Sequence, residues 1–230
     1  MDVIPVLDLK GGTVVRARMG RRDQYRPIET PLAPTSDPVD VARGLLSIHP
    51  FSIVYVADLD AIERRGDNRA ALARLNAAFP DTTLWVDNGV ADLPAAEDWL
   101  AGGLGHLVLG SEAQTNEKLV RHLAVDDRVV LSLDFRDRMF EGPPALMEAA
   151  DAWPGRVIVM TLTRVGSGAG PDLERLRTIQ DAVPNSRVYA AGGVRDVADL
   201  RALKASGIAG ALVASCLHDG RVRGTDLALL

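Results

Sequence analysis

The sequence predicts an α/β protein with a (β/α)8 barrel fold, in which residues 1–230 form a single domain. Eight short aliphatic and β-branched runs alternate with seven amphipathic segments from one end of the chain to the other. Most of these runs are apolar at nearly every position, which is typical of parallel strands buried on both faces. Alternating strands and helices in this number favour a barrel, and a doubly wound sheet is the second choice.

The expected strands are short and regularly spaced, at residues 3–7, 52–57, 82–86, 106–109, 128–133, 156–160, 187–191 and 210–214. Six of the seven segments between them show apolar residues at helical spacing most clearly, at residues 37–48, 68–79, 116–123, 143–153, 172–183 and 196–206. Asp37 suits the N-cap of the first of these helices, and Pro38 suits its first turn. The last helix is reduced to little more than residues 216–220 or 225–230.

The chain has 26 basic and 31 acidic side chains, a formal net charge of −5, and no basic stripe. This balance argues against a nucleic-acid partner, whereas a phosphorylated metabolite needs only a few local donors. Cys216 is the single cysteine, so no intramolecular disulfide can form and a reducing compartment is expected. We see neither a signal peptide nor an apolar run of the ~20 residues that span a bilayer, so we expect a cytoplasmic protein without a membrane partner.

The two halves of the chain resemble each other strand by strand, which predicts a duplicated half-barrel. VIPVLDLKGG in the first expected strand matches VVLSLDFRDR in the fifth, so Asp8 corresponds to Asp134. Three further matches follow from the same comparison, and they pair Asp58 with Thr161, Gly89 with Gly193, and Gly110–Ser111 with Ala214–Ser215.

Asp8 and Asp134 each follow an apolar run at the carboxyl end of the first strand of a half-barrel. Active sites of (β/α)8 barrels lie at this end, and the first and fifth strands face each other across the barrel. A lone aspartate there usually caps a turn, but a symmetry-related pair favours proton transfer, with one carboxyl accepting and the other donating. We therefore predict that Asp8 and Asp134 form an acid/base pair.

Glycine-rich turns after the last strands predict a phosphate site. Barrels of this kind commonly bind phosphate at the ends of the seventh and eighth strands, through backbone amides that glycine leaves accessible. The GSGAG turn after the sixth strand can add further amides. The candidate phosphate ligands are Gly192, Gly193, Ala214, Ser215, Gly166 and Ser167.

The equivalent turns of the first half are candidates for a second anion or substrate site. Gly89, Gly110 and Ser111 occupy the corresponding positions, but Asp87 and Glu112 bring negative charge to the same place. A second phosphate at this point is therefore an open alternative.

The connection from Lys10 to Asp37 runs 28 residues, which suggests a lid or a substrate loop. It holds five arginines, and Arg16 is the candidate ligand for the second anion or substrate site. A guanidinium can bind phosphate or carboxylate through two parallel hydrogen bonds. The four histidines show no metal-ligand spacing, so we predict neither a metal nor a cofactor.

Together these motifs resemble the histidine-biosynthesis barrels, the HisA-type isomerases and the HisF-type cyclases. The resemblance covers the whole chain in order, through VLDLKGGTVVR, ADLDAI, LSLDFR, AAGGV and VASCLH. It implies that Asp8 and Asp134 are the general acid and base, that Thr161 is a polar helper, and that one phosphate binds at the last two strands. It also implies an aldose-to-ketose isomerisation of Amadori type on a phosphorylated small molecule.

The chain departs from that family at the turns after strands three to six. Strand three ends in VDNGV where the family has a Gly-Gly-Gly-Ile-Arg-like run, Glu112 follows strand four, and RVG after strand six lacks the family's acid. The aromatic residue that the isomerase uses after strand five is missing. We therefore predict isomerisation of a small phosphorylated metabolite other than the histidine intermediate. The alternatives are an enzyme of one-carbon cofactor biosynthesis in a methylotroph or methanogen, and a non-catalytic barrel subunit.

Overall fold

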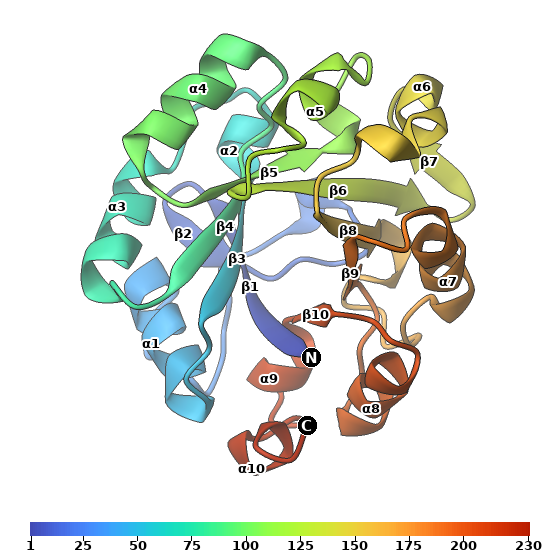
Figure 1. The fold of residues 1–230 in the computed structure, drawn as a ribbon. Helices are drawn as coiled ribbons and strands as arrows, with labels where there is room; N and C mark the ends of the chain where they lie inside the picture. The colour runs from blue at the N-terminus through green and yellow to red at the C-terminus, as the bar shows by residue number, and fades with distance from the viewer.

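Eight parallel strands close into a barrel in the computed structural model, which describes residues 1–230 (Figure 1). The strands follow the chain order around the barrel, and pairing of the last with the first completes the ring. They are β1 (Asp2–Lys10), β3 (Ile53–Asp58), β4 (Thr83–Asp87), β5 (His106–Gly110), β6 (Val129–Arg136), β8 (Arg156–Thr161), β9 (Arg187–Ala191) and β10 (Gly210–Val213). The predicted (β/α)8 fold is confirmed, and each predicted strand overlaps one of these eight.

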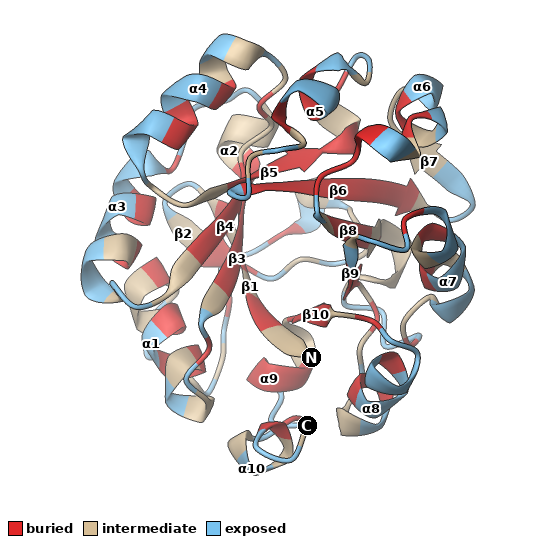
Figure 2. Ribbon diagram, viewed as in Figure 1, coloured by how far each residue is buried: buried red, intermediate tan, exposed pale blue.

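Helices surround the barrel and turn their buried faces toward the strands (Figures 1 and 2). The longer ones are α1 (Pro38–Ile48), α3 (Arg69–Ala78), α4 (Leu93–Gly102), α7 (Leu173–Ala182) and α8 (Val197–Ala205). The shorter ones are α2 (Leu59–Ile62), α5 (Lys118–Leu123), α6 (Pro144–Glu148), α9 (Ser215–His218) and α10 (Gly224–Leu227). None of them has the length and apolar character that a membrane crossing requires.

Side-chain caps fix where these helices begin. As predicted, Asp37 is the N-cap of α1 and accepts a hydrogen bond of 2.9 Å from the amide of Val39, while Pro38 occupies the first turn. Asp196 caps α8 in the same way and accepts a hydrogen bond of 2.9 Å from the amide of Ala198. Because each cap holds the first turn of its helix, the turns that join strand to helix at the carboxyl end of the barrel have defined lengths.

The hydrophobic core has two layers. A cluster of 46 buried side chains fills the space between the barrel and the helices. A second cluster of 13 fills the barrel interior, where Trp85 and Tyr189 meet edge to face with 5.0 Å between their ring centroids. Because neighbouring residues of a strand point to opposite sides, β3 gives Tyr55 to the inner cluster and Val56 to the outer one. The carboxyl ends of the strands lie above this inner packing and are available for a site.

Each half of the barrel carries the same hairpin at its first strand. β2 (Thr13–Val15) folds back antiparallel on β1, and β7 (Met139–Glu141) folds back on β6. Asp8 pairs with Val15 and Asp134 with Glu141, seven residues later in both halves. This shared hairpin supports the predicted duplication. It also divides the long connection after β1, because residues 16–36, including the 3-10 turn η1 (Arg22–Gln24), form a separate segment that we call loop 16–36.

Candidate active site

A cavity of about 850 Å³ lies at the carboxyl ends of the barrel strands. Strand ends from all sides of the barrel line it, and loop 16–36 contributes Arg22 and Tyr25 to its wall. This is the end at which (β/α)8 barrels hold their active sites. The volume suits a small metabolite.

Asp8 and Asp134 both line this cavity. They stand on β1 and β6, which are separated by three strands in either direction around the barrel. The two carboxyl groups therefore approach the cavity from opposite sides, as the sequence repeat predicts.

Asp134 is held by two buried serines. Ser132 Oγ donates to Oδ1 at 3.0 Å, and Ser111 Oγ lies 3.1 Å from Oδ2. Ser111 Oγ also lies 2.7 Å from the carbonyl oxygen of Glu141, which can only accept, and the serine has a single hydrogen to donate. A proton on Oδ2 of Asp134 satisfies both contacts, because the carboxyl then donates to Ser111 while Ser111 donates to the carbonyl. The geometry thus favours the protonated form of Asp134.

Burial raises the pKa of both aspartates, but their neighbours differ. Burial and the nearby carboxylates of Asp87 and Glu112 raise the pKa of Asp134 to about 8. Burial raises the pKa of Asp8 to about 7, and the Arg22 guanidinium opposes that rise. Asp134 therefore holds its proton more strongly than Asp8 does, which is the arrangement that an acid and a base require.

Asp87, at the end of β4, adds a third carboxyl group to the cavity wall. It is only 7% exposed, and its Oδ1 accepts a hydrogen bond of 3.1 Å from the amide of Gly89. A Cβ at Gly110 would lie 2.9 Å from Oδ2 of Asp87, so the lack of a side chain at this position makes room for the carboxylate. Burial, then the charge of Glu112, raises the pKa of Asp87 to about 7.

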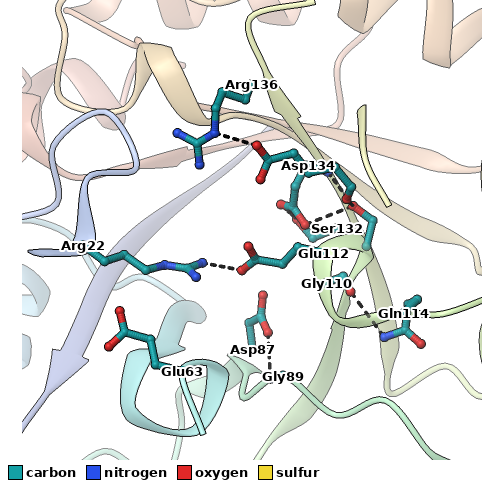
Figure 3. Close-up of polar contacts among 12 residues, drawn as sticks. Arg22, Glu63, Asp87, Gly89, Gly110, Glu112, Gln114, Ser132, Asp134 and Arg136 are labelled. Atoms are coloured by element: carbon teal, nitrogen blue, oxygen red, sulfur yellow. Dashed lines mark hydrogen bonds and ion pairs between the residues drawn. The ribbon is translucent and has the colours of Figure 1, made fainter. Parts of the chain in front are cut away.

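Glu112 also lines the cavity, and it pairs with Arg22 (Figure 3). Glu112 belongs to the 3-10 turn η2 (Ser111–Ala113), which directly follows β5. Arg22 reaches it from loop 16–36, where Lys10 Nζ donates to the Arg22 carbonyl oxygen at 3.0 Å. The ion pair thus ties the loop to the end of β5, across the cavity mouth.

Asp87→Asn should stabilise the protein at alkaline pH more than at acidic pH. The native state raises the pKa of Asp87 from 3.8 to about 7, so its ionisation costs stability as the pH rises from about 4 through 7. Asparagine carries no charge and can still accept from the Gly89 amide. Thermal unfolding of both proteins at pH 5 and pH 8 measures the difference in stability, since each kcal/mol of unfolding free energy corresponds to roughly 2–4 °C in Tm. A Tm difference that does not grow with pH would contradict the expectation.

Four predicted site residues stand at strand ends without lining the cavity, namely Thr161, Gly89, Gly110 and Ser111. The Thr161 hydroxyl instead accepts a hydrogen bond of 3.2 Å from Arg175 of α7. Ser111 holds Asp134, and the two glycines shape the surroundings of Asp87. Ser111, Gly89 and Gly110 therefore support the carboxylates from outside the cavity, whereas Thr161 contacts α7.

The six predicted phosphate residues all line the cavity: Gly166, Ser167, Gly192, Gly193, Ala214 and Ser215. Gly193 has a φ of +91°, and a Cβ there would lie 2.2 Å from the carbonyl oxygen of Gly170. The amide of Gly170 donates to the Gly193 carbonyl oxygen at 3.1 Å. Only glycine lets the turns after β8 and β9 pack this closely, which brings their backbone to one side of the cavity.

Arg16 also lines the cavity, but its guanidinium pairs with Asp219 at 3.4 Å and donates to the carbonyl oxygen of Glu29 at 3.2 Å. The loop arginine that reaches the carboxylates is Arg22. Sequence reasoning selected Arg16 and not Arg22, because the path of the loop decides which of the five arginines reaches these carboxylates. It also missed His218, a buried cavity residue whose Nδ1 lies 3.0 Å from Thr30 Oγ1.

Comparison with known proteins identifies the family. Residues 2–223 match the family described as Histidine biosynthesis protein. The chain belongs to this family. Its relatives include proteins named 1-(5-phosphoribosyl)-5-((5-phosphoribosylamino)methylideneamino)imidazole-4-carboxamide isomerase. The isomerase from Halorhodospira halophila is 31% identical, and the match covers 99% of this chain and 95% of the relative. The isomerase from Hyphomonas neptunium is 32% identical, and the match covers 96% of this chain and 95% of the relative.

A more distant relative is an uncharacterised protein of Methanocaldococcus jannaschii, 27% identical over 96% of this chain and 94% of its own length. These matches confirm the resemblance that the sequence motifs indicated. The cavity with its carboxylates and glycine-rich turns therefore belongs to a barrel of the histidine-biosynthesis family.

Proposed function

We propose that the protein is an isomerase that converts a phosphorylated aminoaldose into the corresponding aminoketose, with Asp8 and Asp134 as its base and acid. The observation that carries this proposal is the placement of the two carboxyl groups on opposite sides of one cavity, in a barrel of the histidine-biosynthesis family. The separation of their pKa values supports distinct roles for them.

Asp134 acts first as the acid. Its carboxyl donates a proton to the ring oxygen of the aminoaldose, the bond between that oxygen and C1 breaks, and a C1 iminium forms. Asp8 then removes the proton from C2, and the electron pair of that bond forms the C1–C2 double bond of a neutral enaminol. Asp8 returns its proton to C1, while the hydroxyl proton on C2 passes to Asp134. The product is the aminoketose, and both carboxyl groups regain their starting states.

The phosphate of the substrate binds at the ends of β8, β9 and β10 in this proposal. Backbone amides of the glycine-rich turns there can donate to phosphate oxygens without side-chain obstruction. Anchoring the phosphate on this side places the sugar between Asp8 and Asp134, so that proton transfer becomes an intramolecular event in the complex.

The substrate carries a single phosphate, unlike the compound after which the relatives are named, which has two phosphoribosyl groups. The end of the cavity at β4 and β5 supports this choice, because Asp87 and Glu112 line it. Two carboxylates in a partly buried site repel a phosphate dianion, and the pairing of Glu112 with Arg22 offsets only one of them.

Ribose 5-phosphate labelled with 13C at C1, mixed with an alkylamine, tests the proposal. The two form an N-alkylribosylamine 5-phosphate in solution, and we expect the protein to accelerate its rearrangement to the 1-alkylamino-1-deoxyketose phosphate. The 13C signal of C1 changes from an aminal carbon to a methylene carbon, so NMR follows the reaction directly.

Two results would contradict the proposal. If the protein does not accelerate the rearrangement beyond an Asp8→Asn, Asp134→Asn double variant, the barrel is not this isomerase. If the chain restores growth to a histidine auxotroph that lacks the isomerase, it accepts a substrate with two phosphates, and the single-phosphate assignment is wrong.

A further inference from the structure

The two ends of the cavity differ in charge. Glycine-rich turns line the end at β8, β9 and β10, where the one carboxylate, Asp219, pairs with both Arg16 and Arg221. Asp87 and Glu112 line the end at β4 and β5, where Arg22 pairs with Glu112 alone. Asp8 and Asp134 lie on the wall of the same cavity. A ligand that fits this cavity must therefore be chemically different at its two ends.

Asp87 is a buried carboxyl group that lines the cavity and forms no ion pair of its own, although the charge of the nearby Arg22 guanidinium acts on it. It is 7% exposed, and none of the ion pairs of the chain includes it. The amide of Gly89 supports Oδ1, and the missing side chain of Gly110 makes room for Oδ2. Burying a carboxylate that has no ion pair of its own is costly, so this arrangement is typical of a group that meets its partner in a bound ligand.

A side chain of the protein already places a cation here. The Arg22 guanidinium pairs with Glu112, and Figure 3 shows Asp87 next to that pair. Arg22 and Glu112 keep 28% and 24% of their side-chain surface exposed, so the pair is accessible to exchange. Because the pair is only partly buried, a cationic group of a ligand can compete with Arg22 for Glu112.

The shape of the site fits an organic cation better than a metal ion. No group of three or more carboxylate, imidazole or thiol side chains comes together as metal ligands would. Two separated carboxylates suit an ammonium or amidinium group, which has several N–H donors and can satisfy both at once.

We propose that the substrate carries a cationic nitrogen at the end opposite its phosphate, and that this nitrogen binds between Asp87 and Glu112 in place of the Arg22 guanidinium. The inference rests on the single-phosphate isomerase proposed above. It assigns Asp87 and Glu112 as specificity-determining residues and describes the substrate as a zwitterion, anionic at one end and cationic at the other.

Calorimetric titration with ω-aminoalkyl phosphates of increasing chain length tests this proposal. The matched probes are ω-hydroxyalkyl phosphates, which lack the charge, and α,ω-alkyl bisphosphates, which reverse it. We expect one chain length at which the amine binds about tenfold more tightly than the alcohol, with the bisphosphate weakest. Asp87→Asn should abolish the preference for the amine and leave the affinity for the alcohol unchanged. Asp92→Asn, which changes an exposed carboxylate of the same turn, should preserve the preference.

Arg22→Gln provides a second test, because it removes the guanidinium that the amine must displace. The ratio of amine to alcohol affinity should then rise. Equal affinities for amine and alcohol at every chain length, or tighter binding of the bisphosphate, would overturn the cationic subsite and leave the phosphate site standing. Failure of all three probes to bind would instead overturn the phosphate site, and with it the inference.

Discussion

Asp8→Asn and Asp134→Asn should each lower the kcat of the isomerisation by about 10²–10⁴-fold, because each removes one partner of the proton transfer. The KM for the phosphorylated substrate should change little, since the proposed phosphate site is at the ends of β8, β9 and β10. Both replacements keep the size of the side chain, and the amide introduced by Asp134→Asn can still accept from the Ser132 hydroxyl. Rates measured with the 13C-labelled ribosylamine give both constants.

The pH profile separates loss of chemistry from loss of structure. In the unaltered protein kcat/KM should rise as Asp8 loses its proton near pH 7 and fall as Asp134 loses its own near pH 8, which gives a narrow maximum. Asp23→Asn, at an exposed carboxylate of η1, should leave that maximum in place. An Asp134→Asn variant that keeps the alkaline fall would show that another group is the acid.

Gly193→Ala should destabilise the protein and weaken phosphate binding at least tenfold. Its φ of +91° disfavours any side chain, and the added Cβ would lie 2.2 Å from the carbonyl oxygen of Gly170, so one of the two turns must move. Strain and overlap together should cost about 3 kcal/mol, which lowers Tm by roughly 6–12 °C. Differential scanning calorimetry measures the first effect, and titration with an ω-hydroxyalkyl phosphate measures the second.

Gly168→Ala is the matched control for that prediction. Gly168 lines the same cavity and also has a positive φ of +70°, but no atom lies within 4 Å of an added Cβ. Its cost should be limited to backbone strain, about 1–2 kcal/mol. If both variants lost the same stability and the same phosphate affinity, the close packing of Gly193 on Gly170 would not be what shapes the site.

The eight barrel strands could be predicted from the sequence because burial on both faces leaves nearly continuous apolar runs. The two hairpin strands could not. β2 and β7 are three residues long, and pairing with the preceding strand defines them, so no apolar run marks them.

The candidate site also has residues that could be predicted from the sequence and residues that could not. Asp8 and Asp134 could be predicted because a strand end fixes where a carboxyl group points, and the repeat distinguishes the pair from a chance aspartate. Thr161 stands one residue from two cavity residues, Met160 and Leu162, and its hydroxyl contacts Arg175 instead. Such a difference depends on the local direction of each side chain, and the inward turn of Arg22 depends on the fold of an entire loop.

The hairpin of β1 and β2 has a consequence for how this barrel can change. Backbone pairing of Asp8 with Val15 fixes the carboxylate before loop 16–36 begins. Insertions, deletions or exchanges within that loop can therefore alter what enters the cavity without moving Asp8, the proposed base. Natural selection or protein engineering can therefore change the cavity entrance while the reaction centre stays the same.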